Sequence, residues 1–190
     1  MFARTKRLLL RPGWLEDAPA LAAAIGDEAV LRNLARAPSP YHVEDAESFL
    51  SMAADPLLPL FLIFSRTRGA PRLVGGCGLL RDDAGRPELG YWIARPYWGL
   101  GFATEAARAV MGIARATGIK GVVSSHMLDN PASGNVLRKV GFRPTGRILQ
   151  RHSAGRNGVV ACAEFEQGEE IAMPSPLHED LYTDTRPLAA

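Results

Sequence analysis

The most informative stretch of this 190-residue chain reads Trp98-Gly99-Leu100-Gly101-Phe102-Ala103-Thr104. It lies between a predicted strand and the most regular predicted helix, residues 103–117, whose small and apolar residues recur on one face. Glycines let the backbone approach a ligand closely, and the first amides of a helix have no acceptor within the helix. Together with the helix macrodipole, such amides hold an anion without a lysine. The stretch therefore predicts a phosphate-binding turn, the alternative being an ordinary tight turn that leads into a helix.

Two common nucleotide-binding motifs do not fit this stretch. The Gly-Lys-Ser/Thr sequence of a P-loop is absent. A Rossmann dinucleotide site requires glycine at the sixth motif position, where Thr104 stands, and a strand that runs directly into the first glycine. Here Pro96-Tyr97-Trp98 intervenes, and no alternation of strands and long helices precedes the motif. A nicotinamide-binding domain is therefore disfavoured.

The composition is typical of one globular domain. Hydrophobic residues make up 47% and charged residues 22% of the chain, and the formal net charge is only +2. The basic residues do not gather into a stripe, so we expect no nucleic-acid partner. The two cysteines, Cys77 and Cys162, lack the spacing of metal ligands, so we interpret them as buried thiols and predict no metal site.

Apolar runs indicate no targeting or membrane segment. The run Leu8–Leu10 is too short for the core of a signal peptide. No uncharged apolar run approaches the roughly 18 residues that suggest a membrane span. We therefore expect a soluble cytoplasmic protein without a membrane partner.

Hydrophobic periodicity and turn residues predict a mixed α/β (α+β) domain over residues 1–167. The residues after 167 show no periodicity and contain several prolines, so 168–190 are predicted to form a poorly ordered tail. Gly75-Gly76-Cys77-Gly78 favours a β-bulge inside a strand over a phosphate loop. The predicted strands cover 7–11, 60–65, 72–80, 88–94, 121–127, 145–152 and 159–165, and the predicted helices cover 16–25, 28–36, 43–54, 103–117 and 131–140.

Four segments together resemble the GNAT N-acetyltransferases, in particular the branch of ribosomal-protein N-terminal acetyltransferases of the RimJ/RimL type. Residues 98–103 resemble the family's pyrophosphate loop, Gln/Arg-x-x-Gly-x-Gly/Ala. Residues 5–11 resemble the opening strand of that branch, residues 88–93 its fourth strand, and residues 129–142 its late Asn-x-x-Ser helix. The four segments occur in the family's order and spacing.

This resemblance implies a single domain with a mixed, mostly antiparallel sheet that is splayed beside the fourth strand and flanked by helices. Acetyl-coenzyme A would lie in the gap. The backbone of Ile93, Ala94 and Arg95 would pair with pantetheine, and Asn130 together with Ser133 would reach the pantetheine arm. Without a ligand, Ile93 is a core residue and the other two are helix-capping residues. The residues implied to hold the pyrophosphate are Trp98, Gly99, Leu100, Gly101, Phe102, Ala103 and Thr104.

Acetyl transfer requires a neutral amine, a polarised thioester carbonyl and a leaving thiolate. Many family members use a tyrosine of the late helix as the acid, but the matching residue here is Leu137. The resemblance makes Ser133 the candidate proton donor or hydrogen-bond partner of the thiol. Glu88 is the preferred base, acting through a water, and His126 is the second choice. The alternatives are a solvated strand residue for Glu88 and a structural role for His126.

These observations predict an acetyl-coenzyme A dependent N-acetyltransferase that acts on a primary amine by direct attack in a ternary complex, a protein N-terminal amine being one candidate acceptor. A non-catalytic acyl-coenzyme A binding module remains an alternative because of Leu137. A small-molecule amine acetyltransferase, for polyamines or antibiotic-like amines, is another. Residues 18–54 and the final hairpin would form the walls of the acceptor groove. A homodimer through exposed strand edges is left open.

Overall fold

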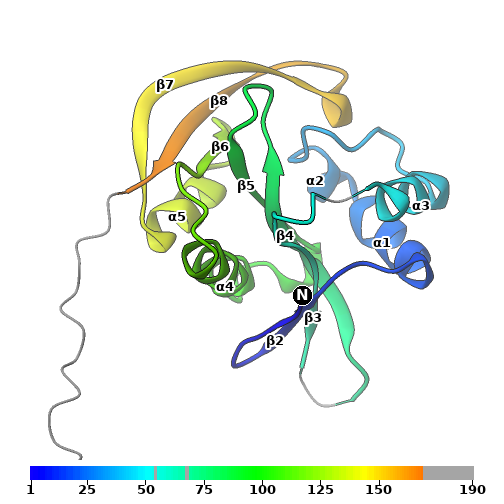
Figure 1. Cartoon of the computed structure of the whole chain (residues 1–190). Coiled ribbons are helices and arrows are strands. Elements are labelled where there is room, and N and C mark those ends of the chain that lie inside the picture. Colours follow the sequence, from blue (N-terminus) through cyan, green and yellow to red (C-terminus); the bar gives the residue numbers. More distant parts are fainter. Residues whose placement is uncertain (54, 67–68, 169–190) are drawn as a thin grey trace, which may run out of the picture.

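The computed structural model describes residues 1–53, 55–66 and 69–168, and it consists of a central sheet with helices on both faces (Figure 1). Three short 3₁₀ segments, Leu15–Asp17, Arg95–Tyr97 and Ala154–Arg156, link longer elements. The helices are α1 (Ala18–Ile25), α2 (Glu28–Leu31), α3 (Val43–Ser51), α4 (Phe102–Ala116) and α5 (Pro131–Val140). The strands are β1 (Ala3–Arg4), β2 (Leu8–Arg11), β3 (Leu60–Ser65), β4 (Arg72–Arg81), β5 (Pro87–Ile93), β6 (Val123–Met127), β7 (Phe142–Ser153) and β8 (Gly158–Gln167).

Among the described residues, eight strands form one sheet in the order β1-β2-β3-β4-β5-β6-β8-β7. All neighbouring strands are antiparallel except β5 and β6, which are parallel. These two strands share a single registered pair, Glu88 and Val123, whereas β4 and β5 pair over seven positions. The sheet therefore splays between β5 and β6, and the predicted mixed, mostly antiparallel fold is confirmed. The predicted fourth strand is β5, because the two-residue β1 was not predicted.

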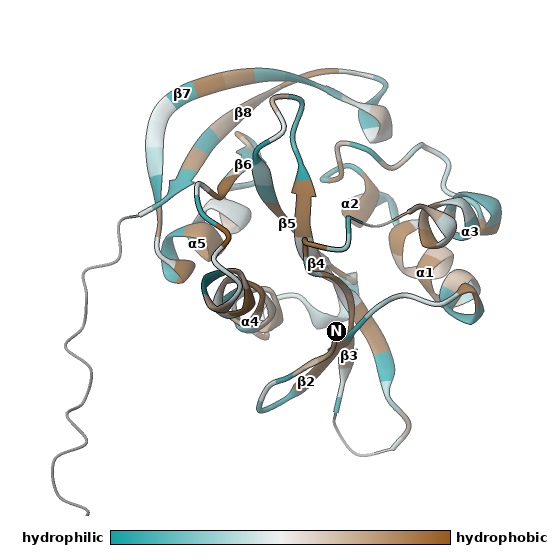
Figure 2. Cartoon of the chain, in the orientation of Figure 1, coloured by the Kyte–Doolittle hydropathy of each residue, from teal (hydrophilic) through white to brown (hydrophobic). Residues whose placement is uncertain are grey.

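Alternating side chains of the central strands build two hydrophobic cores on opposite faces of the sheet. Leu8, Leu10 and Ile63 pack with the apolar face of α4, on which Ala106 and Val110 are fully buried. Their strand neighbours pack with α1 and α3 on the other face. Figure 2 shows hydrophobic residues concentrated along β4, β5 and the adjacent side of the helices. The sheet is thus covered on both faces where β5 ends and α4 begins.

The predicted helix 28–36 is wrong in length, because α2 ends at Leu31. Asp27 caps its start by accepting a hydrogen bond from the Ala29 amide at 2.9 Å. Beyond Leu31, backbone carbonyls bond to the β7–β8 turn instead of continuing the helix. The donors are Arg156 Nε to the Arg32 oxygen at 2.7 Å, Ser153 Oγ to the Leu34 oxygen at 3.3 Å and the Ala154 amide to the Ala35 oxygen at 2.8 Å. Tertiary hydrogen bonds therefore override the helical pattern here.

Other predicted elements are confirmed with shifted ends. The helix predicted over 43–54 ends at Ser51, and residue 54 lies outside the described residues. The pairing of β4 with β3 skips Val74, since Ile63 lies opposite Gly75 and the next residue lies opposite Leu73. This irregularity borders the glycine-rich segment in which a bulge was predicted. Of the predicted tail, only residue 168 is described.

Candidate active site

The gap between β5 and β6 is the first feature of the candidate site. Just beyond the single backbone pair, the Ser124 hydroxyl donates to the Leu89 carbonyl at 2.8 Å, so a side chain replaces the next backbone bond. On the other side of β5, the Ala94 amide donates to the Val74 carbonyl at 2.9 Å. Because alternate residues of a strand direct their backbone groups to opposite neighbours, Ile93 directs its own toward the gap. Of the three residues predicted to pair with pantetheine, Ala94 therefore has its amide engaged inside the sheet.

The glycine turn lies at the end of this gap and is open. Gly99 and Gly101 have φ values of 76° and 78°, in the left-handed region that favours glycine. A Cβ at Gly99 would meet no atom within 4 Å, and a Cβ at Gly101 would meet only Arg7 Nη2, at 3.6 Å. Trp98 and Leu100, the side chains on either side of Gly99, are about half exposed, at 46% and 50%. The turn thus leaves room for a ligand against its backbone.

The first turn of α4 supplies amides beside the glycines. The first bond of the helix runs from the Glu105 amide to the Gly101 carbonyl at 3.1 Å. The preceding amides of Phe102, Ala103 and Thr104 have no hydrogen-bond acceptor within the part of the chain that is described. Free amides at a helix N-terminus next to left-handed glycines form a concave anion-binding surface. The residues present therefore fit a pyrophosphate group.

The Trp98 side chain forms a hydrogen bond between the start of this turn and the end of β5. Its indole Nε1 donates to the Ile93 carbonyl at 2.6 Å. This carbonyl was predicted to face pantetheine, and one of its two lone pairs is already used within the chain. The Arg95 guanidinium lies 3.8 Å from the Asp27 carboxylate. The Trp98 side chain therefore links the start of the turn to the backbone at the end of β5.

Ser133 and Asn130 meet at the start of α5, on the far side of the gap. The Asn130 side chain accepts a hydrogen bond from the Ser133 amide at 3.3 Å, so Asn130 caps the helix. The Ser133 hydroxyl is 2.9 Å from the phenol oxygen of Tyr91, which also donates to the Ser133 carbonyl at 2.8 Å. Sequence reasoning did not include Tyr91 in the site. The available signal was a phenol that alternates with Leu89 and Ile93 on a buried face of the strand.

Tyr91 and Leu137 have different surroundings. Burial raises the pKa of the Tyr91 phenol, and the hydrogen bond with Ser133 only partly opposes this, so the phenol keeps its proton at neutral pH. Leu137, which stands where many family members have a tyrosine, is fully buried in the core. An acid from that position is therefore absent, and the hydroxyls brought together are those of Tyr91 and Ser133.

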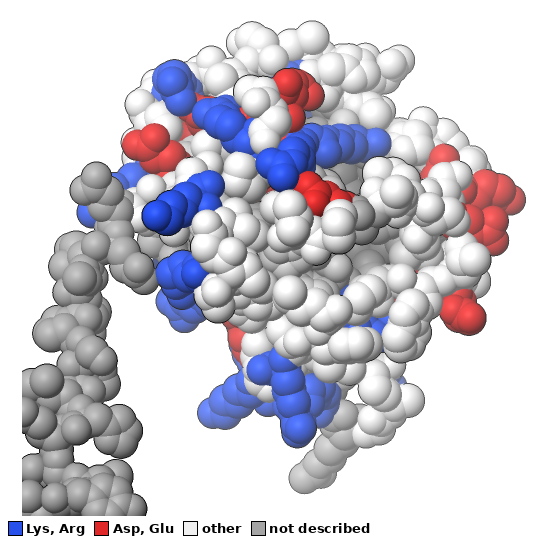
Figure 3. All heavy atoms as spheres, in the orientation of Figure 1, with Lys and Arg blue, Asp and Glu red and all other residues white. Residues whose placement is uncertain are grey.

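Glu88, the preferred base, is engaged with other residues. Glu88 Oε1 accepts hydrogen bonds from Arg151 Nη1 at 2.6 Å and from Ser125 Oγ at 3.3 Å. Its Oε2 lies 4.0 Å from the guanidinium of Arg36. Figure 3 shows the same mixture on one face, where basic side chains stand next to acidic ones over the upper part of the molecule. Glu88 is thus the centre of an ion-pair cluster that links β5 to β7.

His126 lies on β6 with both ring nitrogens facing protein. Nδ1 is 2.9 Å from the Met127 carbonyl oxygen, and the ring packs against Phe165 with centroids 5.4 Å apart. Nε2 faces α5 at Gly134, where an added Cβ would collide with it. The Nδ1 atom therefore faces a carbonyl oxygen, whereas Nε2 packs against α5 without a hydrogen-bond partner among the described residues.

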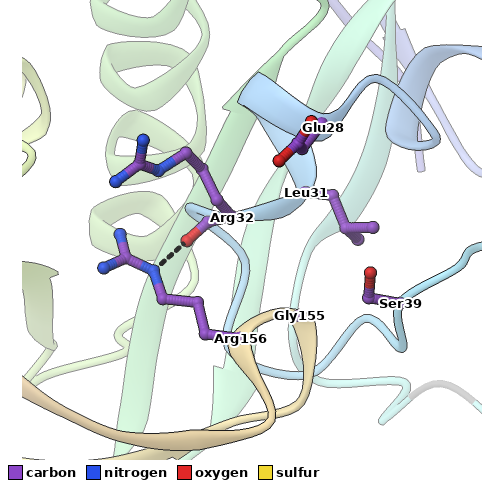
Figure 4. Close-up of a pocket in the computed structure, with 6 residues that line it drawn as sticks. All are labelled: Glu28, Leu31, Arg32, Ser39, Gly155 and Arg156. Atoms are coloured by element: carbon purple, nitrogen blue, oxygen red, sulfur yellow. Dashed lines mark hydrogen bonds between the residues drawn. The ribbon is translucent and has the colours of Figure 1, made fainter.

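A cavity of about 320 Å³ lies between α2 and the β7–β8 turn (Figure 4). Arg156 Nε donates to the Arg32 carbonyl across it, and both guanidinium groups extend toward the same side. There Asp129 accepts two hydrogen bonds from Arg156, at 2.8 and 3.0 Å, and one from Arg32 at 3.3 Å. These bonds, foremost that from Arg156, lower the pKa of Asp129. The lining residues are Glu28, Leu31, Arg32, Ser39, Gly155 and Arg156.

The same arginine borders a second hollow of about 180 Å³ that includes Leu128 and Asp129. Asp129 directly precedes the Asn130 cap of α5, so the second hollow lies beside the start of that helix. Within the described residues, no group of three or more His, Cys, Asp or Glu side chains could hold a metal ion. No described helix is both long enough and apolar enough to cross a bilayer.

Comparison with known proteins identifies the family. The acetyltransferase (GNAT) domain family matches residues 7–143. The chain belongs to the GNAT family. Two curated relatives are the uncharacterized N-acetyltransferases YoaA of Bacillus subtilis (strain 168) and p20 of Bacillus licheniformis. YoaA is 28% identical over 158 residues, which cover 77% of this chain and 85% of YoaA. The p20 protein is 27% identical over 158 residues, which cover 79% of this chain and 86% of p20. Family membership makes this protein an acyltransferase enzyme.

Solved acetyltransferase structures share the fold. The ribosomal L7/L12 alpha-N-protein acetyltransferase RimL, in complex with coenzyme A, aligns with a TM-score of 0.71 at 19% identity, covering 88% of this chain and 97% of that one. The microcin C7 self-immunity acetyltransferase MccE, in complex with acetyl-CoA and AMP, aligns at 0.72 and 18% identity, covering 86% and 93%. A GNAT acetyltransferase from Bacillus anthracis aligns at 0.72 and 21% identity, covering 87% and 97%. The predicted resemblance and fold are thereby confirmed.

Proposed function

We propose that this GNAT enzyme transfers the acetyl group of acetyl-coenzyme A to a primary amine, which attacks the thioester directly in a ternary complex. The observation that carries the proposal is the open glycine turn at the start of α4. Gly99 and Gly101 leave space against the backbone, and the first amides of α4 have no acceptor among the described residues. The turn lies at the end of the gap between β5 and β6, where an extended ligand can lie beside Ile93. Coenzyme A complexes of the related folds RimL and MccE support the same cosubstrate.

Different residues along the gap bind different parts of coenzyme A. The amides from Gly99 to Thr104 hold the pyrophosphate, and the backbone of Ile93 and Arg95 pairs with pantetheine. Asn130 lies at the far end, where its cap fixes the start of α5. Acetyl-coenzyme A supplies an activated acyl group, a thioester whose thiol is a tolerable leaving group at a pKa of about 8.5 if it resembles cysteine.

The reaction forms one carbon–nitrogen bond and breaks one carbon–sulfur bond. The amine lone pair attacks the acetyl carbon, the sulfur leaves with the bonding electrons, and the nitrogen loses one proton. Ser133 donates a hydrogen bond from its hydroxyl to the sulfur, which leaves as a thiolate and takes its proton from water. Water in the gap, or Glu88 through a water, accepts the proton of the nitrogen. Tyr91 holds the Ser133 hydroxyl in place from β5.

The surroundings of the preferred base support an α-amine as acceptor. Glu88 is engaged by Arg151 and Ser125. Because its preferred carboxylate is held in these contacts, the site suits an amine that is already partly neutral. The ordinary pKa of an α-amine is about 7.7 to 8.0, whereas that of a lysine side chain is about 10.4. The acceptor we propose is therefore the N-terminal amine of a peptide or protein.

Titration calorimetry with acetyl-coenzyme A tests the cosubstrate, and absence of binding at high protein concentration would exclude this function. Release of the coenzyme A thiol is then measured with a peptide carrying a free α-amine, the same peptide with a blocked N-terminus and a free lysine, and a polyamine. We expect the free α-amine to react fastest near neutral pH. Binding without thiol release from any amine would indicate a non-catalytic acyl-coenzyme A module. Faster reaction of the polyamine would instead indicate a small-molecule enzyme.

A further inference from the structure

Arg7 lies ahead of β2 in the chain, yet it contacts the glycine turn and the first residues of α4. Its Nη1 donates to the Leu100 carbonyl at 2.9 Å, in the middle of the turn. Its Nε donates to Glu105 Oε2 at 2.7 Å, and its backbone amide donates to Glu105 Oε1 at 3.0 Å. The guanidinium carbon is 4.6 Å from the ring centroid of Phe102. One side chain therefore connects the strand, the turn and the helix.

Further hydrogen bonds hold the Glu105 carboxylate in place, so the contact between Arg7 and Glu105 has a fixed orientation. Thr5 Oγ1 donates to Glu105 Oε1 at 2.6 Å, which makes four donors from two residues around one carboxylate and the turn. Burial raises the pKa of Glu105, but the hydrogen bonds from Thr5 and Arg7 outweigh it and lower the pKa overall, so the carboxylate stays ionised. Because Glu105 compensates the charge of Arg7, the main effect of Arg7 on a nearby anion is geometric rather than Coulombic.

The bond to Leu100 has a direct geometric consequence. In a trans peptide the carbonyl and the following N–H point in opposite directions. With the Leu100 carbonyl held by Arg7, the Gly101 amide is held pointing away from Arg7. We propose that Arg7 is a positioning residue, which fixes the Leu100–Gly101 peptide plane so that the Gly101 amide and the first amides of α4 converge on the pyrophosphate. This inference rests on the proposed function, because it assumes that coenzyme A binds at this turn.

A purely structural role for Arg7, as a link between β2 and α4, makes a different prediction. If Arg7 had only this role, its removal would lower kcat/KM by the same factor for every substrate. A positioning role at the pyrophosphate affects only substrates that carry this group. S-acetylpantetheine carries the same thioester and pantetheine arm but has no pyrophosphate, so a comparison with acetyl-coenzyme A separates the two roles.

The experiment compares Arg7→Ala, Arg7→Lys and wild type. Calorimetry measures the Kd for coenzyme A, and thiol release measures kcat/KM for acetyl-coenzyme A and for S-acetylpantetheine. For Arg7→Ala we expect the Kd to rise at least about tenfold, as loss of a charge-assisted hydrogen bond implies. Its kcat/KM with S-acetylpantetheine should stay at the wild-type value. Arg7→Lys should not restore binding, because one ammonium group cannot contact both Leu100 and Glu105 in the fork geometry of arginine.

Arg66→Ala is the matched control. Arg66 donates to the Thr5 carbonyl at 2.9 Å and pairs with Arg7 through the backbone, but it makes no described contact with the glycine turn. Its removal deletes one positive charge from the same region and should leave the Kd for coenzyme A unchanged. A Glu105→Gln substitution should raise the Kd for coenzyme A only because it releases the Arg7 side chain. The double variant Arg7→Ala/Glu105→Gln should therefore bind coenzyme A no more weakly than Arg7→Ala alone.

Three outcomes would overturn the inference: an unchanged Kd in Arg7→Ala, an equal loss of kcat/KM with both thioesters, or full recovery in Arg7→Lys. The last outcome would mean that charge alone is sufficient. Failure of the proposed function looks different, since the wild-type protein itself would then bind no coenzyme A. Thermal unfolding of each variant checks that the link between β2 and α4 does not limit folding.

Discussion

The phenol of Tyr91 on β5 contacts Ser133 at two atoms, with its oxygen 2.8 Å from the backbone carbonyl and 2.9 Å from the side-chain hydroxyl. When the single phenol proton goes to the carbonyl, the phenol oxygen can accept from the Ser133 hydroxyl. In the proposed reaction this contact holds the hydroxyl beside the β5–β6 gap until the departing sulfur competes for its hydrogen. Tyr91 lies on β5 and Ser133 on the helix that follows β6, so the contact links the two sides of the splay.

A Ser133→Ala substitution should lower kcat about 10²-fold while changing the Kd for acetyl-coenzyme A far less, because the main loss is a hydrogen-bond donor to the departing sulfur. The helix cap is preserved, since Asn130 bonds the backbone amide of this residue. Steady-state thiol release and calorimetry give the two quantities. Tyr91→Phe should reduce kcat by no more than about tenfold, as expected for one neutral hydrogen bond that only orients the serine. Wild-type turnover in Ser133→Ala would remove the serine from the mechanism.

A Gly101→Glu substitution should abolish coenzyme A binding, because it places a side chain and a negative charge against the proposed pyrophosphate position. Gly118→Glu is the control for the strained backbone. Gly118 has a φ of 74°, near the 78° of Gly101, and an added Cβ there would meet no atom within 4 Å. Gly118 lies just after the C-terminal end of α4, whereas Gly101 lies just before its N-terminal end. Calorimetry should detect normal affinity in the control, and an equal loss in both variants would count against the glycine turn.

Features encoded by neighbouring residues could be predicted from the sequence. The glycine turn and α4 are local, since left-handed glycines and a run of small apolar residues specify them without distant partners. The contacts of Tyr91 with Ser133 and of Arg7 with Leu100 were not predicted. Tyr91 and Ser133 are 42 positions apart, and Arg7 and Leu100 are 93 positions apart. No periodicity or motif encodes such pairs, because the sheet topology alone brings them together.

Distant partners also explain why the end of α2 and the surroundings of Glu88 were not predicted. The helix predicted to end at Arg36 ends at Leu31, because the next carbonyls bond to a turn near Arg156. Glu88 was predicted as a base, a role that remains a prediction, and its partner Arg151 lies 63 positions away in the sequence. Local propensity cannot anticipate a hydrogen-bond partner supplied by a hairpin that forms later in the chain.

The two cysteines should react slowly with a thiol reagent such as Ellman's reagent in the native protein. Both side chains are buried, which confirms the interpretation from the sequence, and burial raises the pKa of both Cys77 and Cys162. We expect a rate at least about tenfold below that in denaturant, because each unit of raised pKa lowers the thiolate fraction about tenfold. Absorbance stopped-flow measures both rates. Rapid reaction of native protein would show that the core around Cys77 on β4 or Cys162 on β8 opens frequently.

A Glu164→Gln substitution should destabilise the fold at neutral pH. Glu164 is only 2% exposed on β8 and accepts hydrogen bonds from Arg147 at 2.5 Å, Thr145 at 3.0 Å and Arg86 at 3.1 Å. Glutamine keeps the shape but removes the charge that both arginines share. Since those arginines are partly exposed to water, we expect a loss of about 2 kcal/mol in the free energy of unfolding. Urea denaturation near pH 7 measures it.

The pH dependence of this loss identifies the carboxylate as its source. Burial raises the pKa of Glu164, but the hydrogen bonds from Arg147, Thr145 and Arg86 outweigh it, so the folded-state pKa lies below the unfolded value of about 4.3. The stabilisation is therefore complete above about pH 5 and is lost as the pH falls through the folded-state pKa. The difference between wild type and Glu164→Gln should shrink in acid. Glu166→Gln, on an exposed position of the same strand, should match wild type throughout. A difference that persists unchanged in acid would mean that packing, not charge, is lost.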